Sequence, residues 1–257
     1  MLPKAERVLV ALGLLLATSV HAGEAKLELG GEWATLNDGL GNWEGVYGTF
    51  SYAASTSDLL TLGAVYASRF GEQGMEFTGS WQHDYNESNY QVFSLVGSTA
   101  ALFWPSAGAT TEYFHKFGNA RDWVLGFGGG AYGYRTGNND YFGVLEMIHY
   151  FAGGWVVEAG TQFNLSEPGD VAAPRGFAAL TWLPAAGWEL VLKVDGGDEA
   201  YQIVGPDDLQ TRFQSLSVSE EAFVPVGGGR KIHARLEQYS NPYYDRWLGY
   251  LGVSQSF

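Results

Sequence analysis

The last eleven residues, WLGYLGVSQSF (Trp247–Phe257), decide the fold of this chain. From Trp247 to Val253 every second residue is apolar or glycine, and the chain ends on the aromatic Phe257. The residues between them, from Tyr250 to Ser256, carry hydroxyl groups or are glycine. Alternation of this kind predicts a strand with one apolar and one polar face. A terminal aromatic residue in such a strand is typical of outer-membrane β-barrels, whose strands face lipid on one side and a wet lumen on the other.

The N-terminus predicts export. Lys4 and Arg7 precede an almost wholly apolar run, Val8–Val20, and Val20-His21-Ala22 forms a small-x-small site. This pattern predicts a secretory signal peptide over residues 1–22, cleaved after Ala22. The apolar run is too short for a membrane-spanning helix, which needs roughly 20 residues. Residues 23–257 are predicted to form a single barrel domain.

Composition narrows the choice of function. The chain has a net charge of −14, so its surface is a poor match for nucleic acid, whose phosphates need basic partners. It has no cysteine, which excludes disulfides and thiolate metal sites. Hydrophobic residues make up 46% of the chain without a second long apolar run, so they must be spread by alternation.

About fourteen stretches alternate with period 2, each about ten residues long, which is the length a tilted strand needs to cross a membrane. Clear examples are Met75–Gln82, Trp155–Leu165 and Trp188–Asp195. A soluble sandwich also alternates, but here tryptophans cluster near the predicted strand ends, as in the aromatic girdles of a membrane barrel. The tryptophans concerned are Trp33, Trp43, Trp81, Trp123, Trp155, Trp188 and Trp247.

The predicted connections support this strand count. If both termini face the periplasm, the even-numbered connections should be short periplasmic turns, and all of them are. The two longest connections, Ser166–Pro174 and Gly196–Gln210, both fall in the odd-numbered, extracellular class. We therefore predict an all-β, up-and-down antiparallel transmembrane barrel of about fourteen strands; weak patterning around Ala101–Thr111 and Phe213–Phe223 leaves about twelve to sixteen open.

Strand parity points a set of charged residues into the lumen. Facing lipid, each charge would cost up to several kcal/mol (about 2–4) near the membrane centre. Inward acids outnumber inward bases, which favours cations if the lumen is open. The alternative is a salt-bridge network that fills a narrow barrel. The lumen candidates are Glu76, Glu158, Glu189, Lys193, Lys231, His233, Arg235 and Glu237, with Glu28, Glu32, Asp84 and Glu146 on the same parity.

No pattern indicates a catalytic or metal site. The histidines lack the His-x-x-x-His spacing of a zinc helix, and His83 and Asp84 are sequence neighbours that point to opposite faces of a strand. GFGGGAYG (126–133) lacks the Lys-Ser/Thr of a P-loop and is better explained as small residues in a barrel strand. We expect no enzyme activity, cofactor or metal.

From Arg69–Phe70 to the C-terminus, the chain resembles the YaiO-type outer-membrane barrel domain. The strongest stretch, Asp195–Phe257, contains GGDEAY (196–201), TRFQSLSVS (211–219) and YSNPYYDRWLGYLGVSQSF (239–257); a weaker one is LFWPSAGATTEYFH (102–115). The resemblance implies an outer-membrane location and companionship with polysaccharide synthesis or export proteins, and it brings no catalytic residues. Gln255 departs from the family, whose terminal strand more often carries an aromatic or apolar residue at this position.

We therefore expect a non-enzymatic outer-membrane protein, a conduit or accessory for envelope polysaccharide. The alternatives are a barrel-embedded lipid or lipopolysaccharide hydrolase and a purely structural surface barrel. Expected partners are outer-membrane lipid and the barrel-assembly machinery, which reads Phe257. Residues expected to hold a sugar at the extracellular rim are Tyr201, Asp207, Asp208, Tyr243 and Tyr244.

Overall fold

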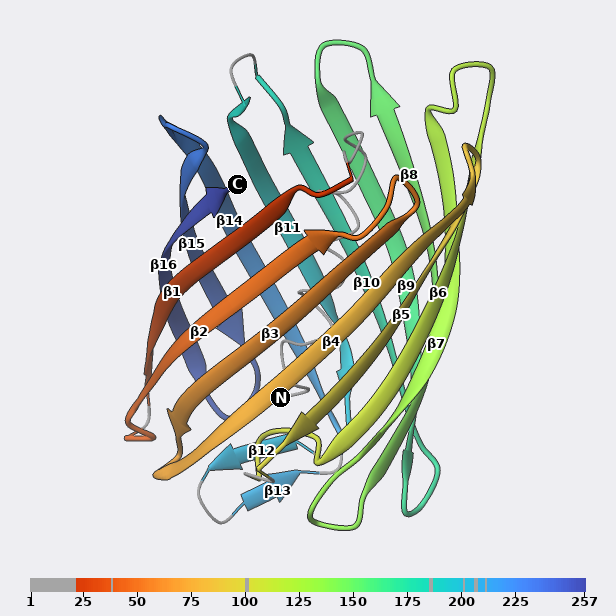
Figure 1. The fold of residues 1–257 in the computed structure, drawn as a ribbon. Coiled ribbons are helices and arrows are strands. Elements are labelled where there is room, and N and C mark those ends of the chain that lie inside the picture. Colours follow the sequence, from red (N-terminus) through yellow and green to blue (C-terminus); the bar gives the residue numbers. More distant parts are fainter. Residues whose placement is uncertain are drawn as a thin grey trace.

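The first and last strands of the chain pair with each other and close the sheet into a barrel (Figure 1). The computed structural model describes residues 22–37, 39–99, 102–184, 187–200, 202–205, 208–210 and 212–257, and only the backbone of 202–205 and 208–210. Leu29 lies opposite Val253 and Trp33 opposite Gly249, so the outward residues of the two strands lie side by side. The predicted signal peptide, residues 1–22, lies outside the described residues except for Ala22.

Fourteen antiparallel strands form the barrel, each hydrogen-bonded to its neighbours along the chain, so the predicted up-and-down architecture is confirmed. A two-stranded sheet of β12 and β13 lies in the connection between β11 and β14. Among the described residues, no helix is long and apolar enough to cross a membrane. The strands are β1 (Ala25–Leu36), β2 (Asn42–Ala53), β3 (Asp58–Arg69), β4 (Glu72–Asn86), β5 (Asn89–Ser98), β6 (Ala107–Phe117), β7 (Trp123–Gly133), β8 (Asn139–Phe151), β9 (Trp155–Glu167), β10 (Val171–Trp182), β11 (Glu189–Glu199), β12 (Gln202–Gly205), β13 (Asp208–Gln210), β14 (Phe213–Gly227), β15 (Arg230–Ser240) and β16 (Asp245–Ser256).

The two ends of the barrel differ. β1 begins and β16 ends at the upper end of Figure 1, which we call the periplasmic end because outer-membrane barrels keep their short turns there. The β12–β13 hairpin lies at the opposite, extracellular end, within the longest connection, between Glu199 and Phe213. The other predicted long connection, Ser166–Pro174, is wrong: β9 continues to Glu167 and β10 begins at Val171. Turn-forming Pro168, Gly169 and Asp170 suffice, and Ser166 and Pro174 belong to the strands.

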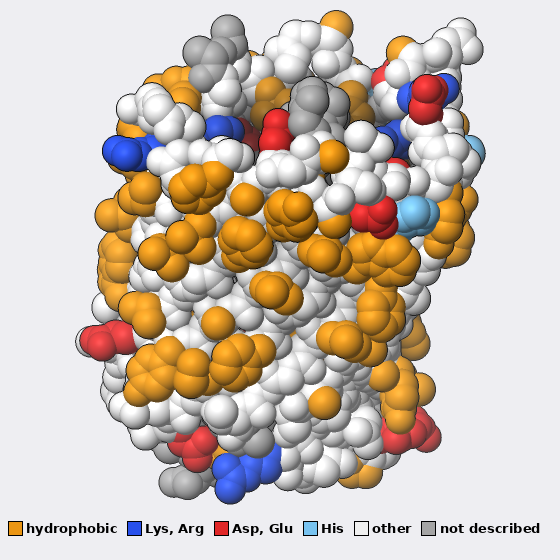
Figure 2. All heavy atoms as spheres, viewed as in Figure 1, with side chains coloured by type: hydrophobic (Ala, Val, Ile, Leu, Met, Phe, Trp, Pro, Cys, Tyr) orange, Lys and Arg blue, Asp and Glu red, His pale blue; other side chains and the backbone are white. Residues whose placement is uncertain are grey.

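Along each strand, residues alternate between the outer wall and the wall that faces the lumen. The outer wall carries exposed Leu, Val, Phe and Trp side chains, which form the apolar band in Figure 2, whereas most charges in that view lie toward the two ends. Buried or half-buried polar side chains face the lumen. Six of the seven tryptophans near strand ends are exposed on the outer wall, as expected of girdles. Trp43 is the exception: it lies inside the lumen and is only 1% exposed.

Candidate functional site

A chamber lies inside the barrel. It has a volume of about 650 Å³ and is lined mainly by β1–β5 and β14–β16. Its lining runs from Glu24 and Phe257 at the periplasmic rim to Arg69 and Trp104 near the extracellular end. Ligand pockets commonly enclose about 300–1,000 Å³, so this space is large enough for a small molecule or a short segment of a bound polymer.

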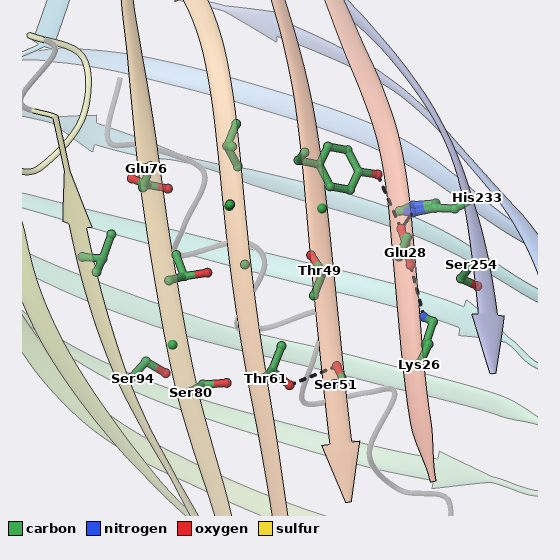
Figure 3. A pocket seen from close by; sticks show the side chains of 18 of the residues that line it. Lys26, Glu28, Thr49, Ser51, Thr61, Glu76, Ser80, Ser94, His233 and Ser254 are labelled. Atoms are coloured by element: carbon green, nitrogen blue, oxygen red, sulfur yellow. Dashed lines mark hydrogen bonds and ion pairs between the residues drawn. The ribbon is translucent and has the colours of Figure 1, made fainter. Parts of the chain in front are cut away.

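A row of hydroxyl side chains crosses the chamber wall (Figure 3). The strand register places Ser51 opposite Thr61 and Thr61 opposite Ser80. Ser94 and Thr110 continue the row on β5 and β6. Neighbouring strands lie about 4.8 Å apart, so the hydroxyls follow one another at that spacing along an inclined path. The oxygens of Ser51 and Thr61 are 3.1 Å apart and bonded. We call these five residues the hydroxyl row.

A charge network centred on Glu28 borders this row. Glu28 accepts a hydrogen bond from the Tyr250 hydroxyl at 3.0 Å and pairs with the Lys26 ammonium at 3.1 Å. His233 Nδ1 lies 2.9 Å from the same carboxylate, and His233 Nε2 lies 3.4 Å from Glu221. The Tyr250 ring also stacks on Tyr47, with ring centres 4.6 Å apart. Because the charges pair within the wall, they line the chamber without filling it.

An aromatic and arginine cluster lies at the extracellular end of the chamber. The Arg69 guanidinium pairs with Glu32 at 2.8 Å and lies over the rings of Trp43, Phe103 and Trp104 at 5.1–5.6 Å. Phe103 and Trp104 are buried and come from the β5–β6 connection, which therefore folds into the barrel. Arg246, which pairs with Glu237, and the rings of Phe70 and Tyr244 lie against Trp43. The Tyr239 ring contacts Arg246 and Tyr244. We call these eight aromatic and arginine residues the extracellular cap.

A group of acidic side chains lies in the lumen beside β6–β11, which we call the filled side. Glu112, Glu146 and Glu158 lie within electrostatic range of one another, with Lys193 near the last two. The glycine-rich stretch 126–133 explains how they fit: a Cβ atom at Gly126 would lie 2.8 Å from Glu146, and one at Gly128 would lie 2.6 Å from Glu112. The glycines of β7 thus leave room for acidic side chains that lie flat against the wall.

The structure places all eight predicted lumen residues on the inner wall but divides them among several surroundings. Lys231, His233, Arg235 and Glu76 line the chamber. Glu158 and Lys193 belong to the filled side. Glu237 pairs with Arg246 in the extracellular cap, and Glu189 lies near Lys231 at the periplasmic end.

The predicted rim residues are not gathered into one site by the described residues. Tyr243 is exposed, and its ring meets Phe213 edge to face at 5.3 Å. Tyr244 is 2% exposed and packs inside the cap, so its ring is not presented to a sugar at the rim. Tyr201 and Asp207 lie outside the described residues, as does the side chain of Asp208.

Sequence reasoning missed several inner-wall residues. Strand parity alone would have found Lys26, which shares a face of β1 with Glu28, and Arg175, which shares a face of β10 with the buried Ala173. Arg175 pairs with Asp195 and Glu199, both at 2.8 Å. Phe103 and Trp104 gave no such signal, because they lie in a connection that only the tertiary structure turns inward.

One group of side chains resembles part of a hydrolase site. It lies on the outer wall at the periplasmic end. His83 Nδ1 lies 2.8 Å from Asp58, and the Ser55 hydroxyl donates to the same carboxylate at 2.6 Å. A nucleophilic serine needs its hydroxyl on the base, with the acid behind the base. Here the carboxylate lies between serine and histidine, so the described contacts do not form that relay.

Comparison with known proteins supports a barrel of the outer membrane. The family described as the YaiO membrane beta barrel domain matches residues 24–202. The match begins well before Arg69 and ends before most of the stretch in which the resemblance looked strongest. No curated protein matches the chain.

Solved structures share the fold at low sequence identity. A bacterial polysaccharide outer membrane secretin is 10% identical, with a TM-score of 0.60, covering 93% of this chain and 99% of its own. The CymD monoaromatic hydrocarbon channel is 10% identical, with a TM-score of 0.65, covering 96% and 93%. An anion-selective porin from Comamonas acidovorans is 6% identical, with a TM-score of 0.52, covering 91% and 98%. At these identities the likeness concerns the fold.

Proposed function

The chain belongs to the YaiO membrane β-barrel family and is an outer-membrane protein; from that premise we propose that it is a non-enzymatic conduit or accessory for envelope polysaccharide. Its barrel is of the kind found in porins, channels and a secretin. The proposal adds a saccharide ligand, held in the chamber, and partners among polysaccharide synthesis or export proteins.

The hydroxyl row is the observation that carries this proposal. A saccharide is recognised through many hydroxyl groups, each able to donate and to accept a hydrogen bond, and serine and threonine hydroxyls do the same. Five of them follow one another across β2–β6 along the chamber wall. A row of similar, weak contacts suits a chain that must slide, because conduction needs several sites that are each easily left.

The asymmetry of the chamber suggests the direction of entry. Its lining includes the periplasmic rim, whereas Arg69 and Trp104 of the extracellular cap line its other end. A saccharide would thus enter from the periplasm and pass outward only if Phe103 and Trp104 move aside. Binding without that movement would make the protein an accessory that holds the saccharide.

The charge of the inner wall favours neutral or cationic sugars over anionic ones. The structure adds acids and bases to those expected from parity, and acids remain in excess among the described residues. An acidic, low-dielectric lumen concentrates cations. The further inner-wall acids are Glu112, Asp140, Asp195, Glu199 and Glu221, and the further bases are Lys26, Arg69, Arg175 and Arg246.

The test is single-channel conductance of the purified barrel in planar bilayers, with neutral oligosaccharides as blockers. We expect cation-selective current that oligosaccharides interrupt. The variant Ser80→Ala/Ser94→Ala/Thr110→Val should shorten the blocks. Thr111→Val is the matched control, because Thr111 follows Thr110 but faces outward. Removing the cap rings with Phe103→Ala/Trp104→Ala should raise conductance, whereas Phe127→Ala on the outer wall should not.

Other outcomes would count for the alternatives. No current in any variant, together with no oligosaccharide binding by the detergent-solubilised barrel, would favour a structural barrel. Anion selectivity would overturn the electrostatic argument. Release of fatty acid from phospholipid or lipopolysaccharide by the purified barrel would favour a hydrolase.

A further inference from the structure

One carboxylate lies on the outer wall of the barrel, which faces lipid. Glu220, in the middle of β14, alternates with the inward residues Ser219 and Glu221 and is exposed on the outer wall. Its neighbours across the sheet are Leu192 and Leu236, both exposed outward apolar residues. The chain thus presents an ionisable group among the leucines that face lipid.

The strand register shows that Glu220 lies deep in the membrane. Toward one side, the row of paired residues passes from Glu220 through Leu236 and Gly249 to Trp33, near the extracellular end. Toward the other side it passes through three outward apolar residues, Leu192, Leu180 and Val157, and reaches His149 at the periplasmic end. With strands about 4.8 Å apart and tilted about 40°, each step changes depth by about 3 Å. Measured along the membrane normal, Glu220 therefore lies about 9 Å from the level of Trp33 and about 12 Å from the level of His149.

No residue that the structure describes compensates for the charge. Glu220 makes no hydrogen bond or ion pair with any residue that the structure describes. The outward side chains next to it on β11 and β15 are Leu190, Leu192, Val194, Ala234, Leu236 and Gln238; only Gln238 is polar, and none is titratable. A glutamate side chain is too short to reach water from this depth, unlike the lysines and arginines that do so near membrane surfaces. An ionisable residue held in lipid marks a functional contact, and its partner must come from another molecule.

We propose that the outer face of β14 and its neighbours, centred on Glu220, is the interface at which two copies of this barrel associate in the membrane. Two copies insert in the same orientation, so the two-fold axis that relates them runs along the membrane normal. Rotation about that axis keeps depth unchanged, so Glu220 of one copy meets Glu220 of the other. A carboxylic acid donates one hydrogen bond and accepts others, so two carboxyl groups that hold at least one proton between them satisfy each other.

The surrounding surface fits a close approach of two walls. Toward the periplasm from Glu220, the paired outward residues are the small Ala222 and Ala234. Small residues let membrane segments approach closely, and polar side chains between them then stabilise the contact. Leu192 and Leu236 flank the carboxyl group and would shield it from lipid.

The experiment uses cysteine cross-linking, since the chain has no cysteine of its own. Val218→Cys places a thiol on the outer wall two residues from Glu220, and Leu62→Cys places the matched control on the outer face of β3. In barrels inserted in membranes we expect oxidative cross-linking of Val218→Cys and none of Leu62→Cys. Adding Glu220→Leu should lower the dimer yield about tenfold, whereas Glu220→Gln, whose amide is also self-complementary, should retain it.

A charge swap makes the test decisive. Glu220→Lys/Val218→Cys alone should give no dimer, because two lysines would face each other. Co-expressed with differently tagged Val218→Cys barrels, it should give mixed dimers, in which lysine meets glutamate. Equal cross-linking of the Val218 and Leu62 positions, or a dimer yield indifferent to Glu220→Leu, would overturn the proposal. Each variant is first checked for heat-modifiable, folded barrel on a gel.

Discussion

The inner and outer walls of this barrel are made from the same strands, yet they treat charge in opposite ways. Glu221 faces inward and meets His233 and Arg235, whereas Glu220, one residue earlier, faces outward and meets no described partner. The inner wall tolerates charges because it supplies partners and water. The outer wall excludes them because lipid supplies neither. A charged side chain on the inner wall therefore belongs to a network within the barrel. One on the outer wall indicates a contact with another molecule.

The strongest test of this comparison removes half of a buried inner-wall pair. Arg246 and Glu237 are bonded in the extracellular cap and are almost fully buried. We expect Arg246→Leu to lower the free energy of unfolding by about 3–5 kcal/mol, because the Glu237 carboxylate stays buried without its guanidinium. The measurement is urea unfolding of the barrel in lipid vesicles. The double variant Arg246→Leu/Glu237→Leu should recover much of the loss, and equal losses in both would show that packing, not charge, holds the cap.

The next prediction places a new charge on each wall at adjacent residues. Leu62 is 62% exposed on the outer face of β3, and Thr61 faces the chamber. Leu62→Arg should cost about 2–4 kcal/mol, because the guanidinium enters lipid near mid-membrane. Thr61→Arg should cost much less, because the chamber is lined by carboxylates such as Glu28 and Glu76. The same vesicle unfolding measures both, and the reverse order would mean that the two walls of β3 are exchanged.

The outer wall was predictable from sequence, and so was the fold. Lipid imposes one rule on every outward position, so the alternation of Met75–Gln82 or Trp155–Leu165 is sufficient to assign the strands. Closure by the terminal strand follows from the same parity. The predicted long connection Ser166–Pro174 was wrong because strand residues on both sides of the short turn were counted as loop.

The inner wall was predictable only as a set of polar positions. Parity points Glu237 inward, but its pairing with Arg246 depends on the register between β15 and β16. The hydroxyl row likewise exists only once five strands are aligned. Trp43 was assigned to a girdle, because a tryptophan near a strand end gives the same pattern whether it faces lipid or the extracellular cap. Glu220 was overlooked because it lies in Phe213–Phe223, whose weak patterning left the parity of Glu220 and Glu221 unassigned.

A smaller effect is expected from a single hydroxyl on each wall. The Tyr250 hydroxyl donates to the Glu28 carboxylate inside the lumen, and the Tyr85 hydroxyl donates to Gln91 on the exposed outer surface. Tyr250→Phe should cost about 1.5–3 kcal/mol, toward the lower end because Lys26 and His233 still contact Glu28. Tyr85→Phe should cost clearly less, since water replaces the lost bond at the membrane surface. Equal losses would mean that the Glu28 network is no better shielded than the rim.

The smallest effect is expected where the wall distinction disappears, at the periplasmic turns. Arg121 and Glu87 form an ion pair there with side chains 47% and 78% exposed, so both are hydrated whether or not they are paired. Such pairs contribute about 0–1 kcal/mol, and salt screens them. Glu87→Gln should therefore leave the free energy of unfolding nearly unchanged, and raising the salt concentration should remove what remains. The buried pair of Arg246 and Glu237 has the same chemistry but should respond little to salt. A strong salt dependence of the Arg246→Leu effect would show that water reaches the extracellular cap. The inner wall would then be no better shielded than the rim at its most deeply buried ion pair.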